Sequence, residues 1–187
     1  MTIPMAIALG IAVLLAGWAA GRLVWTWWKF RGLRVVTCPE NQRPVGVVVD
    51  AGRVAAQALA GAPQLRLASC SRWPERAACG QECLSQVEAA PEDCLVRNIL
   101  LKWYAGKRCA TCGRPFEEIP LAGVKPAVLC ADQVSVEWSE IPADRLQETL
   151  AAAAPICFAC HMGNTMVREH PELVVDRSRF EDRHTSR

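Results

Sequence analysis

The stretch CATCG at residues 109–113 and the stretch CFACH at residues 157–161 decide the fold of the distal third of this 187-residue chain. In each stretch two residues separate two cysteines, and this spacing lets both thiolates bind one metal ion. Two such pairs complete the tetrahedral four-sulfur shell of a structural zinc site, which leaves no open position for a substrate. The predicted zinc ligands are Cys109, Cys112, Cys157 and Cys160.

The residues around these cysteines predict a small zinc-binding fold. Gly113 follows the first pair and allows the positive backbone dihedral of a tight zinc-knuckle turn. Residues 127–129 and 134–138 predict a β-hairpin, and residues 158–170 predict a helix at whose start the second pair lies. A knuckle, a hairpin and a Cys-x-x-Cys at a helix start together resemble the treble-clef zinc finger. The resemblance covers residues 109–171.

The amino-terminal residues 1–30 predict a transmembrane anchor. Residues 1–21 carry no charged side chain, and a helix of that length extends for about 30 Å, the thickness of the apolar core of a bilayer. Three tryptophans within residues 25–28 are typical of the aromatic belt at a membrane surface, so residues 3–28 are expected to contact lipid. The alternative is a cleaved signal peptide. Such a peptide normally begins with Lys or Arg, and no basic residue precedes Arg22.

The basic residues near the anchor predict its orientation. Those that follow the apolar run are Arg22, Lys29, Arg31 and Arg34. Because cytoplasmic segments beside a membrane span are enriched in Lys and Arg, we predict a single-pass protein of the bacterial inner (cytoplasmic) membrane whose soluble part is cytoplasmic. Cytoplasmic thiols stay reduced, so close cysteine pairs are expected to bind metal rather than to form disulfides.

The region between the anchor and the first cysteine pair predicts a small α+β fold. Three segments have the apolar or alternating pattern of β-strands: residues 33–37, 45–49 and 64–69. Asp50 can cap a short helix, and Pro91 begins a longer helix that ends at Gly106. The whole chain is therefore predicted to be α+β. It consists of an anchor (1–30), this α+β region (31–108), a zinc-binding region (109–171) and a flexible charged tail (172–187).

Four further cysteines lie near the ends of predicted elements: Cys38, Cys70, Cys79 and Cys83. They could hold a second metal ion, for which zinc is favoured, or an iron–sulfur cluster, because the spacing from Cys70 to Cys83 resembles part of some ferredoxin signatures. The alternative is that they are small buried apolar side chains. Cys94 is predicted to be structural, and Cys130 has no suitably spaced partner.

Two redox chemistries compete with zinc at the cysteine pairs. The CFACH stretch is also the attachment pattern of c-type haem, with His161 as an axial ligand. Haem attachment requires a location outside the cytoplasm and leaves Cys109 and Cys112 unexplained except as a disulfide. A Cys-x-x-Cys at a helix start also suits thiol–disulfide exchange, although the chain lacks a convincing βαβ pattern. No nucleophile elbow, phosphate loop or dinucleotide motif is present, so a binding module is favoured over an enzyme.

The charge composition argues against a nucleic-acid ligand, because 21 basic and 19 acidic side chains give a net charge of only +2. The anchor and the segments CPE at 38–40, CSRWPER at 70–76 and PEDCLVR at 91–97 resemble a group of bacterial membrane-anchored, cysteine-rich proteins. That resemblance implies no activity. We predict a membrane-anchored zinc protein that acts as a non-catalytic binding, adaptor or assembly module for a protein partner at the membrane.

Overall fold

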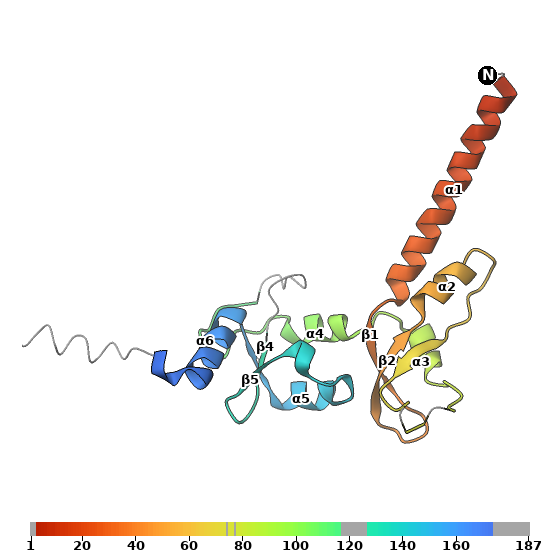
Figure 1. Ribbon diagram of the computed structural model, residues 1–187. Coiled ribbons are helices and arrows are strands. Elements are labelled where there is room, and N and C mark those ends of the chain that lie inside the picture. Colours follow the sequence, from red (N-terminus) through yellow and green to blue (C-terminus); the bar gives the residue numbers. More distant parts are fainter. Residues whose placement is uncertain (1–2, 74, 77, 117–126, 174–187) are drawn as a thin grey trace, which may run out of the picture. The chain divides into compact units, whose positions relative to one another are not determined.

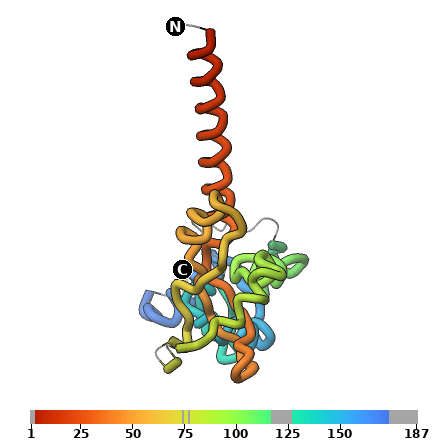
Figure 2. Tube along the Cα trace, turned by 90° about the vertical axis from the view of Figure 1, so that its right-hand side faces the viewer, coloured from red at the N-terminus to blue at the C-terminus, as the bar shows by residue number. Residues whose placement is uncertain are grey.

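The computed structural model describes residues 3–73, 75–76, 78–116 and 127–173. The chain forms two compact units, each with its own three-stranded antiparallel sheet (Figure 1). Figure 2 shows the long amino-terminal helix that begins unit 1. Unit 1 comprises Met1–Leu100 and Pro142–Arg145, and unit 2 comprises Leu101–Ile141 and Leu146–Arg187. The predicted α+β class is confirmed. The predicted flexible tail, 172–187, lies outside the described residues from residue 174 onward.

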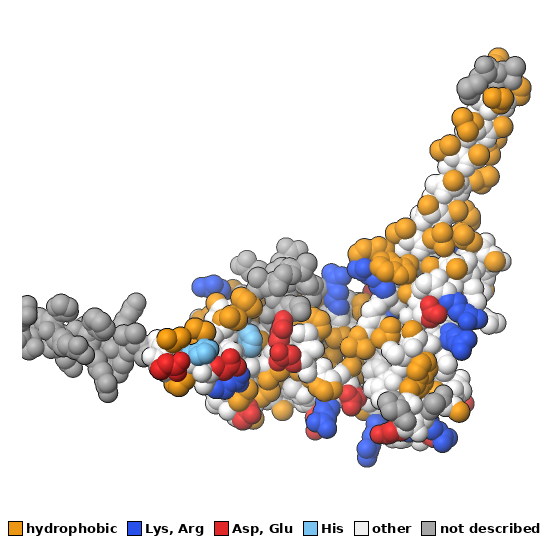
Figure 3. Space-filling view, viewed as in Figure 1, with side chains coloured by type: hydrophobic (Ala, Val, Ile, Leu, Met, Phe, Trp, Pro, Cys, Tyr) orange, Lys and Arg blue, Asp and Glu red, His pale blue; other side chains and the backbone are white. Residues whose placement is uncertain are grey.

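The amino-terminal helix α1 spans Ile3–Phe30 and has 28 residues, so it extends for about 42 Å. Apolar side chains cover the visible face of most of the helix (Figure 3). None of the residues in its most apolar 18-residue window is buried against the rest of the protein. Within the described residues, α1 is the one helix that is long and apolar enough to cross a membrane.

The last turns of α1 belong to the packed part of unit 1. They lie against helix α2, which spans Ala51–Gln57. The Arg22 Nε donates a hydrogen bond to the carbonyl oxygen of Ala58 at 2.8 Å, and the side chain of Thr26 is buried. Phe30 packs against the main hydrophobic cluster of the unit. The helix is therefore attached to the fold through its own final turns.

The sheet of unit 1 has the strand order β1-β2-β3. The strands span Leu33–Thr37 (β1), Pro44–Val49 (β2) and Leu67–Cys70 (β3). The first two confirm the predicted strands, and the third begins three residues later than predicted, at a register shift beside Val49. Helix α3, Leu84–Ala89, adds to the same hydrophobic cluster. Its buried members are Val36, Val45, Val47, Val49, Val54, Leu67, Cys83, Leu84 and Val87.

Arg34 is fully buried, with 0% of its surface exposed, although it lies on β1 shortly after the long apolar helix α1. Its guanidinium donates hydrogen bonds to Lys29 O at 2.7 Å, Phe30 O at 2.6 Å and Gly32 O at 3.1 Å. The last carbonyl groups of a helix have no partner within the helix, so this side chain caps α1. Burial lowers the pKa of Arg34.

Helix α4 spans Val96–Tyr104, and the prediction that it begins at Pro91 was wrong. The backbone of Cys94 and Leu95, just before the helix, pairs with strand β1 instead. The Val35 N–H donates to the carbonyl oxygen of Cys94 at 2.8 Å, and Arg34 forms a β-bridge with Leu95. This pairing with β1 keeps the preceding residues out of a helical conformation. The Cys94 side chain packs against the hydrophobic cluster, and burial raises its pKa.

The sheet of unit 2 has the strand order β5-β4-β6. The strands span Ala127–Leu129 (β4), Ser135–Glu137 (β5) and Ala154–Ile156 (β6). The predicted hairpin of β4 and β5 is confirmed, whereas β6 was not predicted. Helices α5, Leu146–Ala152, and α6, Phe158–Glu169, flank β6 in the sequence. Short 3-10 turns occur at Trp138–Glu140 (η1), Ala143–Arg145 (η2, in unit 1) and Pro171–Leu173 (η3).

Candidate metal centre

The first half of the site is a tight loop from Cys109 to Arg114 in unit 2. The Cys109 N–H donates to the carbonyl oxygen of Arg114 at 2.9 Å, and the Gly113 N–H donates back to the carbonyl oxygen of Cys109 at 2.9 Å. Gly113 has a φ of +70°, a left-handed conformation that glycine adopts without steric cost. The turn directs the amides of Thr111 and Cys112 toward the Cys109 sulfur, so the loop surrounds that sulfur with donors.

The second half of the site begins where β6 ends and α6 starts. Cys157 is the N-cap residue of α6, and its backbone N–H donates to the Cys109 sulfur at 3.3 Å. The Ala110 N–H donates to the carbonyl oxygen of Pro155 at 2.8 Å, which joins the knuckle loop to the unpredicted strand β6. Strand β6 therefore holds the second cysteine pair beside the first.

The four predicted ligands are brought together: the sulfur atoms of Cys109, Cys112, Cys157 and Cys160 all lie within 4.8 Å of one another. The sulfurs of Cys112 and Cys157 are 3.8 Å apart. In a tetrahedral zinc site with Zn–S distances of about 2.3 Å, the sulfurs are about 3.8 Å apart. Cys109 is buried, Cys112 is exposed and the other two are half-buried. The cluster could therefore hold a metal ion such as zinc with four sulfur ligands.

The electrostatics of the cluster favour a bound cation. Burial alone would raise the pKa of the Cys109 thiol, but the amides that point at its sulfur lower that pKa to about 6. Burial raises the pKa of Cys160 to about 12, and its hydrogen bonds with the neighbouring sulfurs and the charge of Cys109 act in the same direction. One thiolate thus opposes the ionisation of the next. A divalent cation removes this repulsion and lets all four sulfurs ionise.

Polar side chains of β5 and α6 hold His161, the residue that follows Cys160, in place. His161 Nδ1 lies 2.9 Å from Ser135 Oγ on β5. Ser135 Oγ in turn donates to Asn164 Oδ1 at 3.0 Å, and Asn164 Nδ2 donates to Gln133 O at 3.3 Å. This ring nitrogen is therefore engaged within the protein, and His161 is not part of the sulfur cluster. Neither Ser135 nor Asn164 was predicted to take part in the site. The signal for Asn164 was its spacing, because it lies three residues after His161 on α6 and residues three apart on a helix share a face.

The predicted second group, Cys38, Cys70, Cys79 and Cys83, lies in unit 1. Cys83 is buried, and the other three are half-buried. Their sulfurs do not approach one another as closely: among the described residues, the first cluster alone brings three or more ligand atoms within 4.8 Å of one another. Burial raises the pKa of Cys83 to about 11, and the charges of the other three thiols contribute to that shift. All ten cysteines of the chain are free thiols in the structure.

The other two cysteines lie apart from both groups. The Cys94 sulfur donates weakly to Ala90 O at 3.4 Å, and Cys130 follows β4 at the hairpin turn, where its N–H donates to Val134 O at 2.9 Å.

No protein-family model, curated protein or solved structure matches this chain. The fold and the site define an α+β protein with one long apolar amino-terminal helix and a four-cysteine cluster that could bind a metal ion.

Proposed function

We propose that this chain is a single-pass membrane protein with a structural zinc ion bound by its four-cysteine cluster, and that it serves as a non-catalytic binding, adaptor or assembly module on the cytoplasmic side. The observation that carries the zinc assignment is the convergence of four sulfurs within 4.8 Å from two segments 45 residues apart in sequence. Four thiolates saturate a tetrahedral ion, so no position is left for a reacting water or substrate.

The treble-clef arrangement supports this assignment. The Cys109 loop, the β4–β5 hairpin and the Cys157 residue at the start of α6 occur in the order that such a finger requires. Helix α5 and strand β6 lie between the hairpin and the second cysteine pair as additional elements. Since β6 pairs with β4, the addition extends the sheet rather than separating the ligand pairs.

The anchor assignment is supported by the length and exposure of α1. The part of α1 before Arg22 is about 28 Å long, which matches the apolar thickness of a bilayer. From Arg22 onward the helix carries basic residues and packs against α2, so we place the cytoplasmic surface of the membrane near Arg22. A signal sequence would instead be removed, and the intact α1 would be missing from the mature protein.

An exposed apolar face on α6 supports a protein partner. Phe158, Met162 and Met166 recur every four residues, so they lie on one side of the helix. Their exposed fractions are 40%, 44% and 46%. A continuous exposed apolar stripe on a helix, rich in methionine, is typical of surfaces that bind other proteins.

The zinc content of the intact protein, purified in detergent after cytoplasmic expression, tests this proposal. Cys109→Ser is expected to lower the zinc content and to unfold the region around β4 and α6, because it removes the most buried ligand. Cys130→Ser is the matched control, a cysteine of unit 2 outside the cluster. Full zinc retention in Cys109→Ser, or a haem absorption band in the wild type, would contradict the zinc assignment. An active alkaline phosphatase fused to the carboxyl end would contradict the cytoplasmic location.

A further inference from the structure

The loop from Cys38 to Arg43 in unit 1 repeats the hydrogen-bond pattern of the zinc-knuckle loop in unit 2. The Cys38 N–H donates to the carbonyl oxygen of Arg43 at 2.9 Å, and the Gln42 N–H donates to the carbonyl oxygen of Cys38 at 2.8 Å. In the knuckle, the Cys109 N–H likewise reaches the fifth residue on and the fourth residue returns the bond, both at 2.9 Å. The fourth residue is left-handed in both loops, with a φ of 55° at Gln42 and 70° at Gly113.

The similarity extends to the sulfur atom. The backbone amides of Glu40 and Asn41 donate to the Cys38 sulfur, and these are the second and third residues after the cysteine. The amides at the same two positions donate to the Cys109 sulfur. Amides directed at a cysteine sulfur stabilise its thiolate form, which is the form that binds metal. The loop has Asn41 where the knuckle has Cys112, so it offers one ligand rather than two.

Two glutamine side chains link α3 and the segment before it to strands β1 and β3. Gln86 of α3 makes two hydrogen bonds with the backbone of Thr37, which precedes Cys38: it accepts from the N–H at 2.9 Å and donates to the carbonyl oxygen at 2.6 Å. Gln81 Oε1 accepts from the Leu67 N–H of β3 at 2.9 Å. These bonds tie α3 to the end of β1, next to Cys38, and tie the segment before α3 to the first residue of β3, the strand that ends at Cys70.

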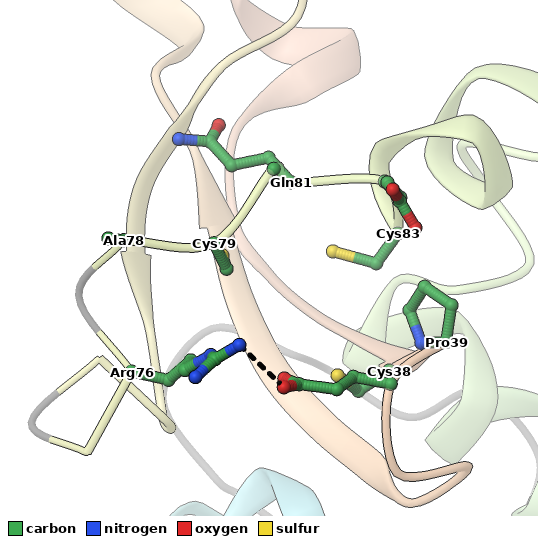
Figure 4. A pocket seen from close by; sticks show the side chains of 10 residues that line it. Cys38, Pro39, Arg76, Ala78, Cys79, Gln81 and Cys83 are labelled. Carbon is green, nitrogen blue, oxygen red and sulfur yellow. Dashed lines mark ion pairs between the residues drawn. The ribbon is translucent and has the colours of Figure 1, made fainter.

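Three of the four cysteines of this group line one cavity. Cys83 is the N-cap residue of α3, and Cys38, Cys79 and Cys83 line a cavity of about 340 Å³ (Figure 4). In Figure 4 the Cys83 sulfur points into this cavity. Cys70 and Cys38 pack against the same hydrophobic cluster that contains Cys83. The ends of β1 and β3, the start of α3 and one loop thus bring the other three thiols close enough to Cys83 to influence its charge.

Positive charge lies beside this group. Arg72 Nη1 donates to the Cys38 sulfur at 3.0 Å and to Glu40 Oε2 at 3.1 Å. Arg76 pairs with the other Glu40 oxygen at 2.9 Å, the ion pair drawn in Figure 4. A zinc ion with four thiolates carries a net charge of −2, so two guanidinium groups with one carboxylate nearby offset part of it.

The geometry points to a second structural zinc site in unit 1, with Cys38, Cys70, Cys79 and Cys83 as its four ligands. The sulfurs are farther apart than those of the first cluster, so binding must draw them together. The fixed part of the site consists of the knuckle-like loop from Cys38 to Arg43, the two glutamine contacts and the buried Cys83. The second ion would join β1, β3 and the start of α3, as the first joins the knuckle loop and the start of α6.

Zinc analysis of the intact protein in detergent, with zinc supplied during expression, tests the second site. The wild type is expected to hold about two zinc ions per chain, and Cys38→Ser about one. Cys94→Ser is the matched control, a half-buried cysteine of unit 1 outside the group, and is expected to retain both ions. One ion in the wild type that Cys109→Ser removes and Cys38→Ser does not would overturn the second site and leave the first intact.

Alkylation of the wild type followed by peptide mass spectrometry gives a readout that does not depend on how the variants fold. Cys79 is only half-buried, and a bound ion is expected to slow its alkylation at least tenfold, with the protection lost on chelation. Cys94, half-buried in unit 1 and outside both groups, reports general accessibility and is expected to react at the same rate before and after chelation. Equal rates at Cys79 with and without chelator would overturn the proposal, as would stoichiometric iron in place of zinc.

Discussion

The cap that Arg34 provides to α1 makes a quantitative prediction. Arg34→Met keeps most of the apolar stem but removes every donor, so the carbonyl groups of Lys29 and Phe30 lose their partners. Hydrogen bonds from a charged donor contribute about 1.5–3 kcal/mol each, and a buried carbonyl group left without a partner costs about 1–3 kcal/mol. Burial of the guanidinium itself is unfavourable, and its Nε has no hydrogen-bond partner among the described residues. We therefore expect the lower end of the range for each of the two carbonyl groups, a total loss of about 3 kcal/mol.

Hydrogen exchange of the intact protein in detergent measures this loss locally. The amides of β1 and β2, which pair from Leu33 to Thr37, report the opening of unit 1. A loss of about 3 kcal/mol corresponds to a fall of about 150-fold in their protection, because each 1.4 kcal/mol is a factor of ten. Arg34→Lys is expected to lose about half as much free energy, since one ammonium group does not reproduce the two-armed contact of the guanidinium.

Arg53→Met is the matched control, because Arg53 is exposed on α2 in the same unit. A surface substitution of this kind changes stability by less than about 0.5 kcal/mol. The cap would be refuted by protection in Arg34→Met that stays within about threefold of the wild type, as it should in Arg53→Met.

Three further predictions follow from single positions. Gly46→Ala should lower the free energy of unfolding by about 1–3 kcal/mol, because the added Cβ would lie 2.7 Å from Ala143 Cβ. Gly52→Ala inside α2 should instead raise the free energy of unfolding by about 0.5–1 kcal/mol, and the midpoints of urea unfolding compare the two variants. Gly113→Ala should lower the free energy of unfolding by about 1–2 kcal/mol because of the φ of +70° alone, since no described atom lies within 4 Å of the added methyl group. Zinc retention in dilute chelator measures this loss. The pKa of Cys109, about 6, lies below that of an unfolded thiol, about 8.5. The unfolded state therefore binds the extra proton between these values, and the stability of zinc-free protein should rise from pH 6 to 8.5, less so in Cys109→Ser.

Local patterns were sufficient to predict the features that depend on neighbouring residues. The β2 strand has a run of valines, and the β4–β5 hairpin has apolar segments separated by a short polar turn, so both were predicted with bounds close to those observed. The Cys109 cluster was predicted because two residues between cysteines suffice for joint metal binding, whatever the fold between the pairs.

The features that the sequence did not reveal depend on contacts between distant residues. Strand β6 contains Pro155 and has three residues, and only its pairing with β4 makes it a strand. Arg34 was assigned to the basic residues beside the membrane, but its position on β1 turns it inward to the end of α1. The knuckle-like loop at Cys38 lacks a second cysteine at the usual spacing, so its backbone pattern was visible only in the structure.

The two clusters differ in how large a share of their buried residues are proposed metal ligands, and this difference predicts how each responds to metal removal. Among the described residues, the main cluster of unit 1 contains nine buried residues, of which one, Cys83, is a proposed ligand. The cluster around β4 has three buried residues among those described, of which Cys109 is a predicted ligand, and Cys157 and Cys160 pack at its edge. Where ligands form part of the hydrophobic cluster, the free energy of metal binding becomes folding free energy.

Chelation is therefore expected to abolish amide protection at β4 before it abolishes protection at β2. The β2 amides belong to the larger cluster and keep their apolar contacts with Val36 and Val54 when metal is removed. Hydrogen exchange in increasing chelator concentration measures both sets in one sample. Loss of protection at β2 before β4, or simultaneous loss at both, would show that metal contributes as much to the larger cluster as to the smaller one and would contradict this order.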